Sequence, residues 1–258
     1  MIKPIVLCAV VGGVIASGSA QATPVFLDTG FGNGADAAVS VTDAGPAANV
    51  NRGDTAGLTV LNNGFSNHIV SFLRFDLTGT VSTITDARLD LVLMSPPQDS
   101  TATFNVSGLN PSLNADNWDE STITGRNQPV EPDGGVVPRG DSTPDPSRTT
   151  FLGQAAVGAA SAGSVVSFSG GGLTPFLNSS LGDLLTLILW NDQDDVDFGH
   201  AFGSKESDLQ APTLALSFSD DNGGTPDNPS QVPEPGTLAM LVLGLAALGG
   251  RARRRLLG

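Results

Sequence analysis

The sequence contains few of the residues on which enzyme chemistry most often depends. It has one cysteine (Cys8), no tyrosine, and two histidines, His68 and His200. Cys8 lies in a segment that we expect to be removed, which leaves no disulfide, no thiol nucleophile and no cysteine metal ligand. The serine-hydrolase, zinc-protease and phosphate-binding glycine motifs do not occur. Acidic residues are so numerous that no pair stands out as glycosidase carboxylates, so the sequence predicts a protein that is not an enzyme.

Positive charge is also scarce. The 258 residues include 12 Lys and Arg against 26 Asp and Glu, a formal net charge of −14. Residues 23–219 alone carry 7 basic and 22 acidic residues, a net charge of −15. A surface of this sign repels phosphate groups, so nucleic acid is excluded as a partner.

The first 22 residues have the organisation of a secretory signal peptide. Lys3 supplies the positive n-region, and residues 5–16 form a short apolar run. Ala20 and Ala22 are the small residues that signal peptidase requires before its cleavage point. The sequence therefore predicts an exported protein, signal peptidase as a processing partner, and one folded domain over residues 23–219.

The C-terminal end has three further parts. Residues 220–231 are rich in Asp, Asn, Gly and Pro and predict a disordered linker. Residues 232–258 hold a polar motif, an apolar run at 237–250 and a basic cluster; the motif and cluster are Pro233, Glu234, Pro235, Arg251, Arg253, Arg254 and Arg255. The apolar run is shorter than the roughly 20 residues of a membrane-crossing helix. We nevertheless expect it to contact the membrane as a short helix, with the arginines on the cytoplasmic side.

This order of parts closely resembles the PEP-CTERM sorting signal of Gram-negative bacteria. In that family, a membrane-embedded exosortase processes the tail near the Pro-Glu-Pro residues. The resemblance implies an inner-membrane intermediate and delivery to the cell surface or extracellular matrix. An ordinary single-span anchor would have the same topology but would keep its tail.

The middle of the chain has the pattern of an all-β domain. The chain contains 32 glycines, and good helix formers are few. Alternating or continuous apolar residues predict strands at 25–28, 58–61, 68–77, 84–94, 103–109, 165–168, 184–190 and 214–218. Short strands separated by Gly- and Asn-rich turns favour an antiparallel β-sandwich or jelly roll.

Residues 131–149 interrupt this pattern with four prolines, so we expect a long exposed loop. Within it, Arg139, Gly140 and Asp141 form a cell-adhesion tripeptide that such common residue types also produce by chance. His68 is expected on a strand, whereas His200 is expected in a loop rich in Asp and Gly.

Three segments of the domain resemble a DNRLRE-type domain, a β jelly-roll module related to carbohydrate-binding modules of alginate-active enzymes. They are residues 71–77 with 84–89, residues 117–124 with Asn127 and Pro129, and residues 202–207 followed by Pro212. Gly125 stands where the family often has tryptophan, and the naming motif does not occur literally. The resemblance implies a jelly roll and a polysaccharide partner. The residues that carry it are Arg74, Asp76, Trp118, Asp119, Glu120, Thr124, Ser204 and Glu206.

Physical roles can be predicted for several of these residues. A half-buried Arg74 needs a carboxylate, and we expect Glu206 to supply it. Trp118 favours a role as a buried plug at one end of the sandwich over a role in sugar stacking. Trp190 closes an apolar strand and is likewise expected in the core. With two tryptophans and no tyrosine, an aromatic platform for sugars would be small.

A cluster of acids raises the question of a structural Ca²⁺. Asp192, Asp194, Asp195 and Asp197 directly follow the strand predicted at 184–190, and Asp28 and Asp36 flank a turn rich in Gly and Asn. Carboxylates and loop carbonyls suit calcium, although the spacing is not that of an EF-hand. Solvated turn acids are the alternative interpretation. A bound Ca²⁺ could also bridge to an anionic polysaccharide.

The sequence as a whole predicts a non-catalytic, exported protein of the cell surface or extracellular matrix that associates with polysaccharide. Two alternatives remain at this point: a structural surface protein without a ligand, and a degenerate glycan-processing enzyme.

Overall fold

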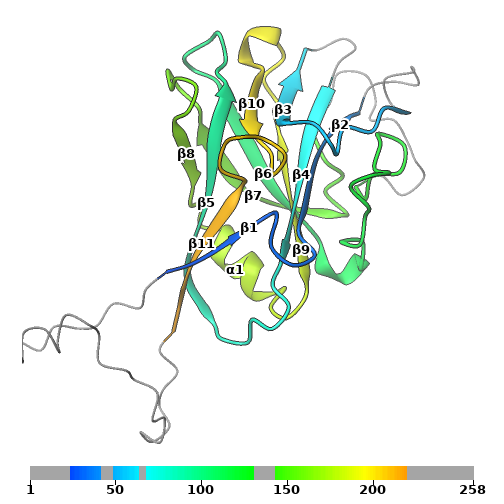
Figure 1. Cartoon of the computed structure of the whole chain (residues 1–258), viewed down its shortest axis with the longest axis vertical. Helices are drawn as coiled ribbons and strands as arrows, with labels where there is room; N and C mark the ends of the chain where they lie inside the picture. Colours follow the sequence, from blue (N-terminus) through cyan, green and yellow to red (C-terminus); the bar gives the residue numbers. More distant parts are fainter. Residues whose placement is uncertain (1–23, 42–48, 64–67, 131–142, 220–258) are drawn as a thin grey trace, which may run out of the picture. The chain divides into compact units, whose positions relative to one another are not determined.

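The computed structural model describes residues 24–41, 49–63, 68–130 and 143–219, and the regular secondary structure in these ranges is almost entirely β-strand (Figure 1). The strands are β1 (Val25–Asp28), β2 (Ala35–Ser40), β3 (Gly57–Asn62), β4 (His68–Asp76), β5 (Ile84–Ser95), β6 (Thr103–Leu109), β7 (Thr149–Ala156), β8 (Val165–Phe168), β9 (Leu184–Trp190), β10 (His200–Gly203) and β11 (Thr213–Phe218). Helix α1 (Leu173–Asn178) and the 3-10 turns η2 (Pro111–Leu113) and η3 (Val196–Phe198) complete the described elements.

All strand pairs are antiparallel, and they form two layers that join into one curled sheet. One layer contains β1, β11, β5 and β8; the other contains β2, β3, β4, β9, β6 and β7. Strand β10 pairs with β5 on one side and with β3 on the other, and so connects the layers. The predicted all-β antiparallel fold is confirmed.

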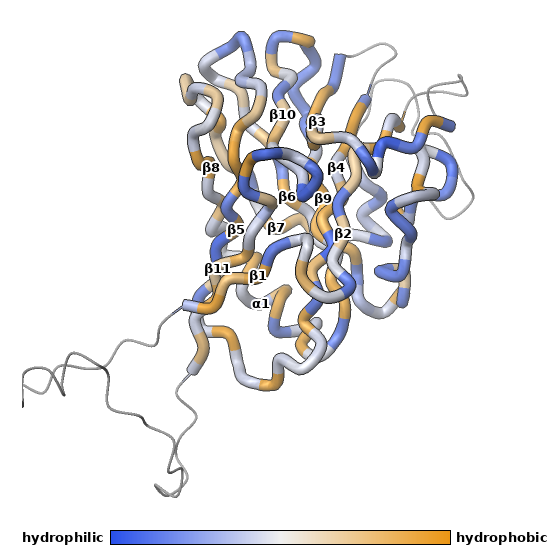
Figure 2. Tube along the Cα trace, viewed as in Figure 1, coloured by the Kyte–Doolittle hydropathy of each residue, from blue (hydrophilic) through white to orange (hydrophobic). Residues whose placement is uncertain are grey.

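Strands β4 and β9 are buried on both of their faces. The inner face packs against β5 and β11 in a large core that includes Leu73, Phe75 and Leu89. The outer face carries Phe72 and Ile188, which pack beneath residues 109–130 in a second core. In Figure 2, apolar residues run along the strands, whereas many connecting loops are hydrophilic. Burial on both faces explains why β9 is apolar at every position except Thr186.

Eight of the described strands were predicted, and four of those have the predicted bounds. Strands β2, β7 and β10 and the short helix α1 were not predicted. The predicted exposed loop at 131–149 is wrong at its end, because Thr149 is buried and begins β7; residues 131–142, which include the Arg-Gly-Asp tripeptide, lie outside the described residues. The interpretation of His200 as a loop residue is also wrong, because it begins β10 and is 3% exposed.

His200 is a buried titratable group in the core. Its ring packs against Phe104 and Phe202, with ring centroids 6.0 and 5.2 Å away, and its Nδ1 donates a hydrogen bond of 2.9 Å to the Phe198 carbonyl. Burial lowers the pKa of His200 to about 4, although the hydrogen bond to Phe198 acts in the opposite direction. The native state therefore resists protonation of a ring that protonates near pH 6.5 when unfolded.

This shift predicts a pH-dependent loss of stability. Above pH 6.5 the neutral His200 does not reduce the free energy of unfolding. As the pH falls to 4.5, protonation of His200 in the unfolded state lowers this free energy by about 2–3 kcal/mol. The variant His200→Phe should lack this loss, because phenylalanine does not titrate. Urea unfolding of both proteins at pH 7 and pH 4.5 measures the difference; equal losses in the two proteins would contradict the prediction.

Candidate functional site

Arg74 on β4 holds the segment that covers the outer face of the sheet. Its Nε donates to the Asn33 carbonyl at 2.8 Å, and its Nη1 donates to the carbonyls of Asp116, at 3.2 Å, and Trp118. The guanidinium also lies 4.9 Å from the centre of the Trp118 ring, a cation–π distance. One side chain thus ties the loop before β2 and the loop after η2 to strand β4.

The predicted pair between Arg74 and Glu206 is wrong. The hydrogen bonds of Arg74 go to three backbone carbonyls, and Glu206 pairs instead with Lys205, whose Nζ lies 3.3 Å from Glu206 Oε1. A guanidinium carries five N–H donors in a planar fork, so backbone carbonyl oxygens can accept its hydrogen bonds in place of a carboxylate.

Trp118 is buried as predicted, but it lies over the outer face of β4 and β9 rather than at one end of the sandwich. It is 7% exposed, packs edge to face against Phe72 at 6.1 Å, and its indole N–H donates to Thr186 Oγ1 at 3.0 Å. Trp190 is 6% exposed and donates to Ser107 Oγ at 3.0 Å. Both tryptophans therefore have satisfied N–H groups and little free ring surface.

Several other predicted residues stabilise turns. Asp76 accepts hydrogen bonds from Asn33 and Thr78; burial raises the pKa of this carboxyl, but the hydrogen bonds outweigh it and lower the pKa. Asp119 accepts from the backbone and side chain of Ser121.

Thr124 and Ser204, two further residues of the family motif, also form hydrogen bonds in turns. Thr124 donates from both its N–H and its hydroxyl to Asn127 Oδ1. Ser204 donates to the Thr55 carbonyl and accepts from the N–H of Glu206. Both side chains are bonded within the fold, which indicates a structural rather than a ligand-binding role.

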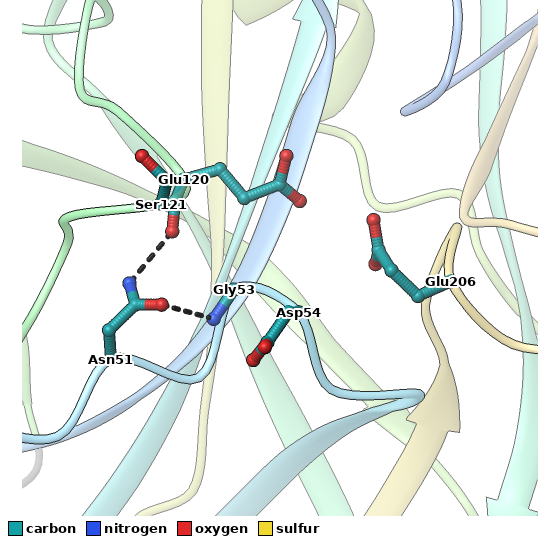
Figure 3. Close-up of a pocket in the computed structure, with 6 residues that line it drawn as sticks. All are labelled: Asn51, Gly53, Asp54, Glu120, Ser121 and Glu206. Atoms are coloured by element: carbon teal, nitrogen blue, oxygen red, sulfur yellow. Dashed lines mark hydrogen bonds between the residues drawn. The ribbon is translucent and has the colours of Figure 1, made fainter.

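Residues from three distant segments form an acidic pocket of about 280 Å³. Figure 3 shows the carboxylates of Glu120 and Glu206 turned toward one another across it, with Asp54 nearby. Asp36, on β2, joins this group: one carboxylate oxygen each from Asp36, Glu120 and Glu206 lies within 4.8 Å of the others. Lys205 Nζ forms ion pairs with Glu120 at 2.6 Å and Glu206 at 3.3 Å.

Asp36 is the buried member of this group. It is 0% exposed, and burial raises its pKa from 3.8 to about 7; the charges of Glu206 and Glu120 add to the increase, whereas hydrogen bonds from Thr29 and the Lys205 N–H oppose it. Its Oδ2 accepts those two bonds, and its Oδ1 has no hydrogen-bond partner among the described residues.

The side chain of Asn51 fixes the position of Glu120. Asn51 Nδ2 donates to the carbonyls of Glu120 and Ile123, both at 2.7 Å, and Asn51 Oδ1 accepts from the N–H of Gly53 (Figure 3). A Cβ atom at Gly53 would lie 2.1 Å from the Glu120 carbonyl oxygen. Glycine is therefore needed for this close approach.

The acids after β9 do not form a comparable group in the described chain, where the Asp36 cluster is the one set of three such ligands. Asp195 caps η3 by accepting from the Asp197 N–H, and Asp192 and Asp194 are exposed. Calcium binding by Asp192, Asp194, Asp195 and Asp197 stays a prediction.

A second, more apolar cleft of about 240 Å³ lies over β6, β7 and β9. Its lining residues are Asn105, Ser107, Thr143, Pro144, Pro146, Thr149, Phe151, Trp190 and Asp192. Phe151 is 59% exposed and meets Trp190 edge to face at 6.3 Å. Asn105 is 2% exposed; its Oδ1 accepts from Gln154, and its Nδ2 has no hydrogen-bond partner among the described residues.

Sequence reasoning missed Lys205, Asn105 and Phe151 as site residues. Phe151 lies on β7, whose alternating pattern is broken by Gly153, so the strand and its exposed aromatic were not recognised. Asp36 was noted as a possible metal ligand, but with Asp28 rather than with Glu120 and Glu206.

The predicted processing residues fall outside the described chain. These are Ala20, Ala22, the Pro-Glu-Pro motif, the apolar run and the arginine cluster. Within the described ranges, no helix has the length and apolar character needed to cross a membrane.

Comparison with known families gives matches in two parts of the chain. Residues 31–135 match the model of carbohydrate-binding module family 96, and residues 231–255 match the PEP-CTERM protein-sorting motif. No curated protein matches the chain significantly. The predicted resemblance is confirmed: residues 31–135 are similar to a carbohydrate-binding module, and residues 231–255 carry the PEP-CTERM sorting motif. The matches indicate carbohydrate binding, processing by an exosortase, and an exported, surface-associated protein.

The position of Trp118 predicts a structural role that can be separated from carbohydrate binding. The variant Trp118→Phe keeps an aromatic ring but is smaller and lacks the hydrogen bond to Thr186, so it should lose about 1–3 kcal/mol of stability. Urea unfolding measures this loss. At urea concentrations below the unfolding transition, the variant should be retained on insoluble polysaccharide as strongly as the wild type. A loss of retention with unchanged stability would place Trp118 in the binding site.

Proposed function

We propose that this protein is a non-catalytic polysaccharide-binding protein of the cell surface or extracellular matrix, and that the cleft over β6, β7 and β9 holds the sugar. The observation that carries this proposal is the exposed ring of Phe151 beside the buried, unpartnered amide donor of Asn105. The family match supports carbohydrate binding but does not identify the site.

Phe151 supplies the apolar wall that a sugar ring requires. One face of a pyranose consists mainly of C–H groups, which pack favourably against the negative face of an aromatic ring. The contact with Trp190 orients the Phe151 ring, and Pro144 and Pro146 extend the apolar lining. Such a site orients a ligand through a few polar groups among apolar ones.

Asn105 supplies the polar group. A buried amide N–H without an acceptor costs free energy, and a sugar hydroxyl in the cleft would provide the acceptor. The Asn105 Oδ1 accepts from Gln154 Nε2 at 3.1 Å, which fixes the amide, and the buried Nδ2 has no hydrogen-bond partner among the described residues. The side chain is thus oriented before a ligand arrives.

The cleft suits one neutral sugar unit of a longer chain. Its volume of about 240 Å³ is slightly below the range of roughly 300–1,000 Å³ of pockets that enclose drug-sized ligands. The residues that line it within the described chain include Asp192 and no basic side chain. A uronate would therefore meet negative charge without a compensating cation.

We expect Phe151→Ala to weaken retention on a neutral polysaccharide by at least tenfold, which corresponds to about 1.4 kcal/mol or more. Phe26→Ala is the matched control, because Phe26 is 60% exposed on β1, outside the cleft. Affinity electrophoresis in gels containing neutral or anionic polysaccharides measures retention. Equal effects of the two variants would contradict the proposed site.

Retention on the same neutral and anionic polysaccharides distinguishes the alternative functions. Absence of retention on every glycan would favour a structural surface protein without a ligand. Release of soluble sugars from a glycan would favour a glycan-processing enzyme.

We further propose that maturation removes both ends of the chain. Signal peptidase cleavage after Ala22 and exosortase processing near Pro233, Glu234 and Pro235 should give a surface form that begins at Thr23 and lacks residues 237–258. Intact-mass analysis of protein released from the cell surface tests both cleavages. A mass that includes the arginine cluster would show that the tail is retained as an anchor.

A further inference from the structure

The carboxylates of the acidic pocket have the spacing of ligands around a single cation. One oxygen from each of Asp36, Glu120 and Glu206 lies within 4.8 Å of the others. Oxygen atoms that share a Ca²⁺ ion, each about 2.3–2.6 Å from it, can be separated by at most about 4.6–5.2 Å. These residues come from β2, from the segment that follows η2, and from the turn after β10. The spacing therefore results from the fold and not from local sequence.

A second observation points to a missing partner. The Asp36 side chain is completely buried, and its Oδ1 has no hydrogen-bond partner among the described residues. Its Oδ2 is fully engaged, since it accepts from Thr29 Oγ1 at 2.5 Å and from the Lys205 N–H at 3.1 Å. Buried carboxylate oxygens are normally satisfied by donors or metal ions.

Lys205 compensates the charge of this group only in part. Its ammonium contacts Glu120 and Glu206, whereas its contact with Asp36 is through the backbone N–H. Arg74 does not contribute a direct bond, because its guanidinium donates to backbone carbonyls. The Lys205 side chain is 25% exposed and flexible, so it can turn into solvent when a stronger cation binds.

We propose that the carboxylates of Asp36, Glu120 and Glu206 bind one Ca²⁺ ion, which displaces the ammonium group of Lys205. The donor set consists of oxygen atoms, which calcium prefers, while zinc favours nitrogen and sulfur. Calcium also tolerates irregular geometry, and the open pocket of about 280 Å³ leaves room for water ligands. The ion would fasten three distant segments together and so stabilise the fold.

Calcium titration of the full-length chain, after removal of cations with EDTA, tests this site. Calorimetry should give one site per chain with a Kd of about 10⁻⁴–10⁻³ M, as in other extracellular modules, and millimolar Ca²⁺ should raise the Tm. Glu206→Gln should weaken binding at least tenfold. Asp86→Asn, which removes one exposed carboxylate on β5, should leave binding unchanged.

Lys205→Met distinguishes the proposed site from a purely structural ion-pair network. Without Ca²⁺ this variant should have a lower Tm than the wild type, because three carboxylates remain uncompensated. With Ca²⁺ it should recover, and it should bind the ion at least as tightly as the wild type. The measurement remains decisive if Glu206→Gln fails to fold.

Three results would overturn the proposal. The first is no calcium binding by the wild type up to 10 mM. The second is loss of binding in Lys205→Met. The third is loss of binding in Asp192→Asn/Asp194→Asn while Glu206→Gln binds normally, which would place the ion after β9.

Discussion

The structure depends on covering the outer face of a sheet layer that is apolar on both sides. Strands β4 and β9 present Phe72 and Ile188 away from the main core, and water contact there would cost hydrophobic free energy. The segment over this face has little regular structure, so its position must come from side chains. Arg74 and Trp118 provide it: the guanidinium binds the loop carbonyls, and the indole fills the space beneath them.

The segment that covers the outer face of β4 and β9 also determines the position of the acidic pocket. Arg74 binds the carbonyl of Trp118, and Glu120 follows two residues later, where Asn51 holds its carbonyl from the other side. Glu120 then also accepts from the N–H of Asp36 at 3.2 Å, across 84 residues of sequence. The charged group is therefore a consequence of how the apolar face is covered, and a change in Arg74 would alter the geometry of the carboxylates.

Strands were predictable where burial imposes a clear pattern, as in β5, where Leu89, Leu91 and Leu93 alternate with other residues. Strand β2 was missed because all six of its residues are buried and three are alanines, so neither alternation nor strong β-propensity marks it. Strand β7 was missed because Gly153, with φ of 143°, breaks its register. The acidic residues after β9 attracted attention because they are adjacent in sequence, whereas Asp36, Glu120 and Glu206 become neighbours only through long-range pairing.

The negative charge of the domain affects ligand binding at the acidic pocket and at the apolar cleft in different ways. The acidic pocket and the apolar cleft share no lining residue, so a ligand in one need not touch the other. The cleft lacks basic residues in its described lining, and the net charge of −15 of residues 23–219 opposes anionic sugars at longer range. One divalent cation would change that charge only to −13. Repulsion of anionic polymers would therefore persist with calcium bound, and the proposed preference of the cleft for neutral glycans does not depend on an ion in the acidic pocket.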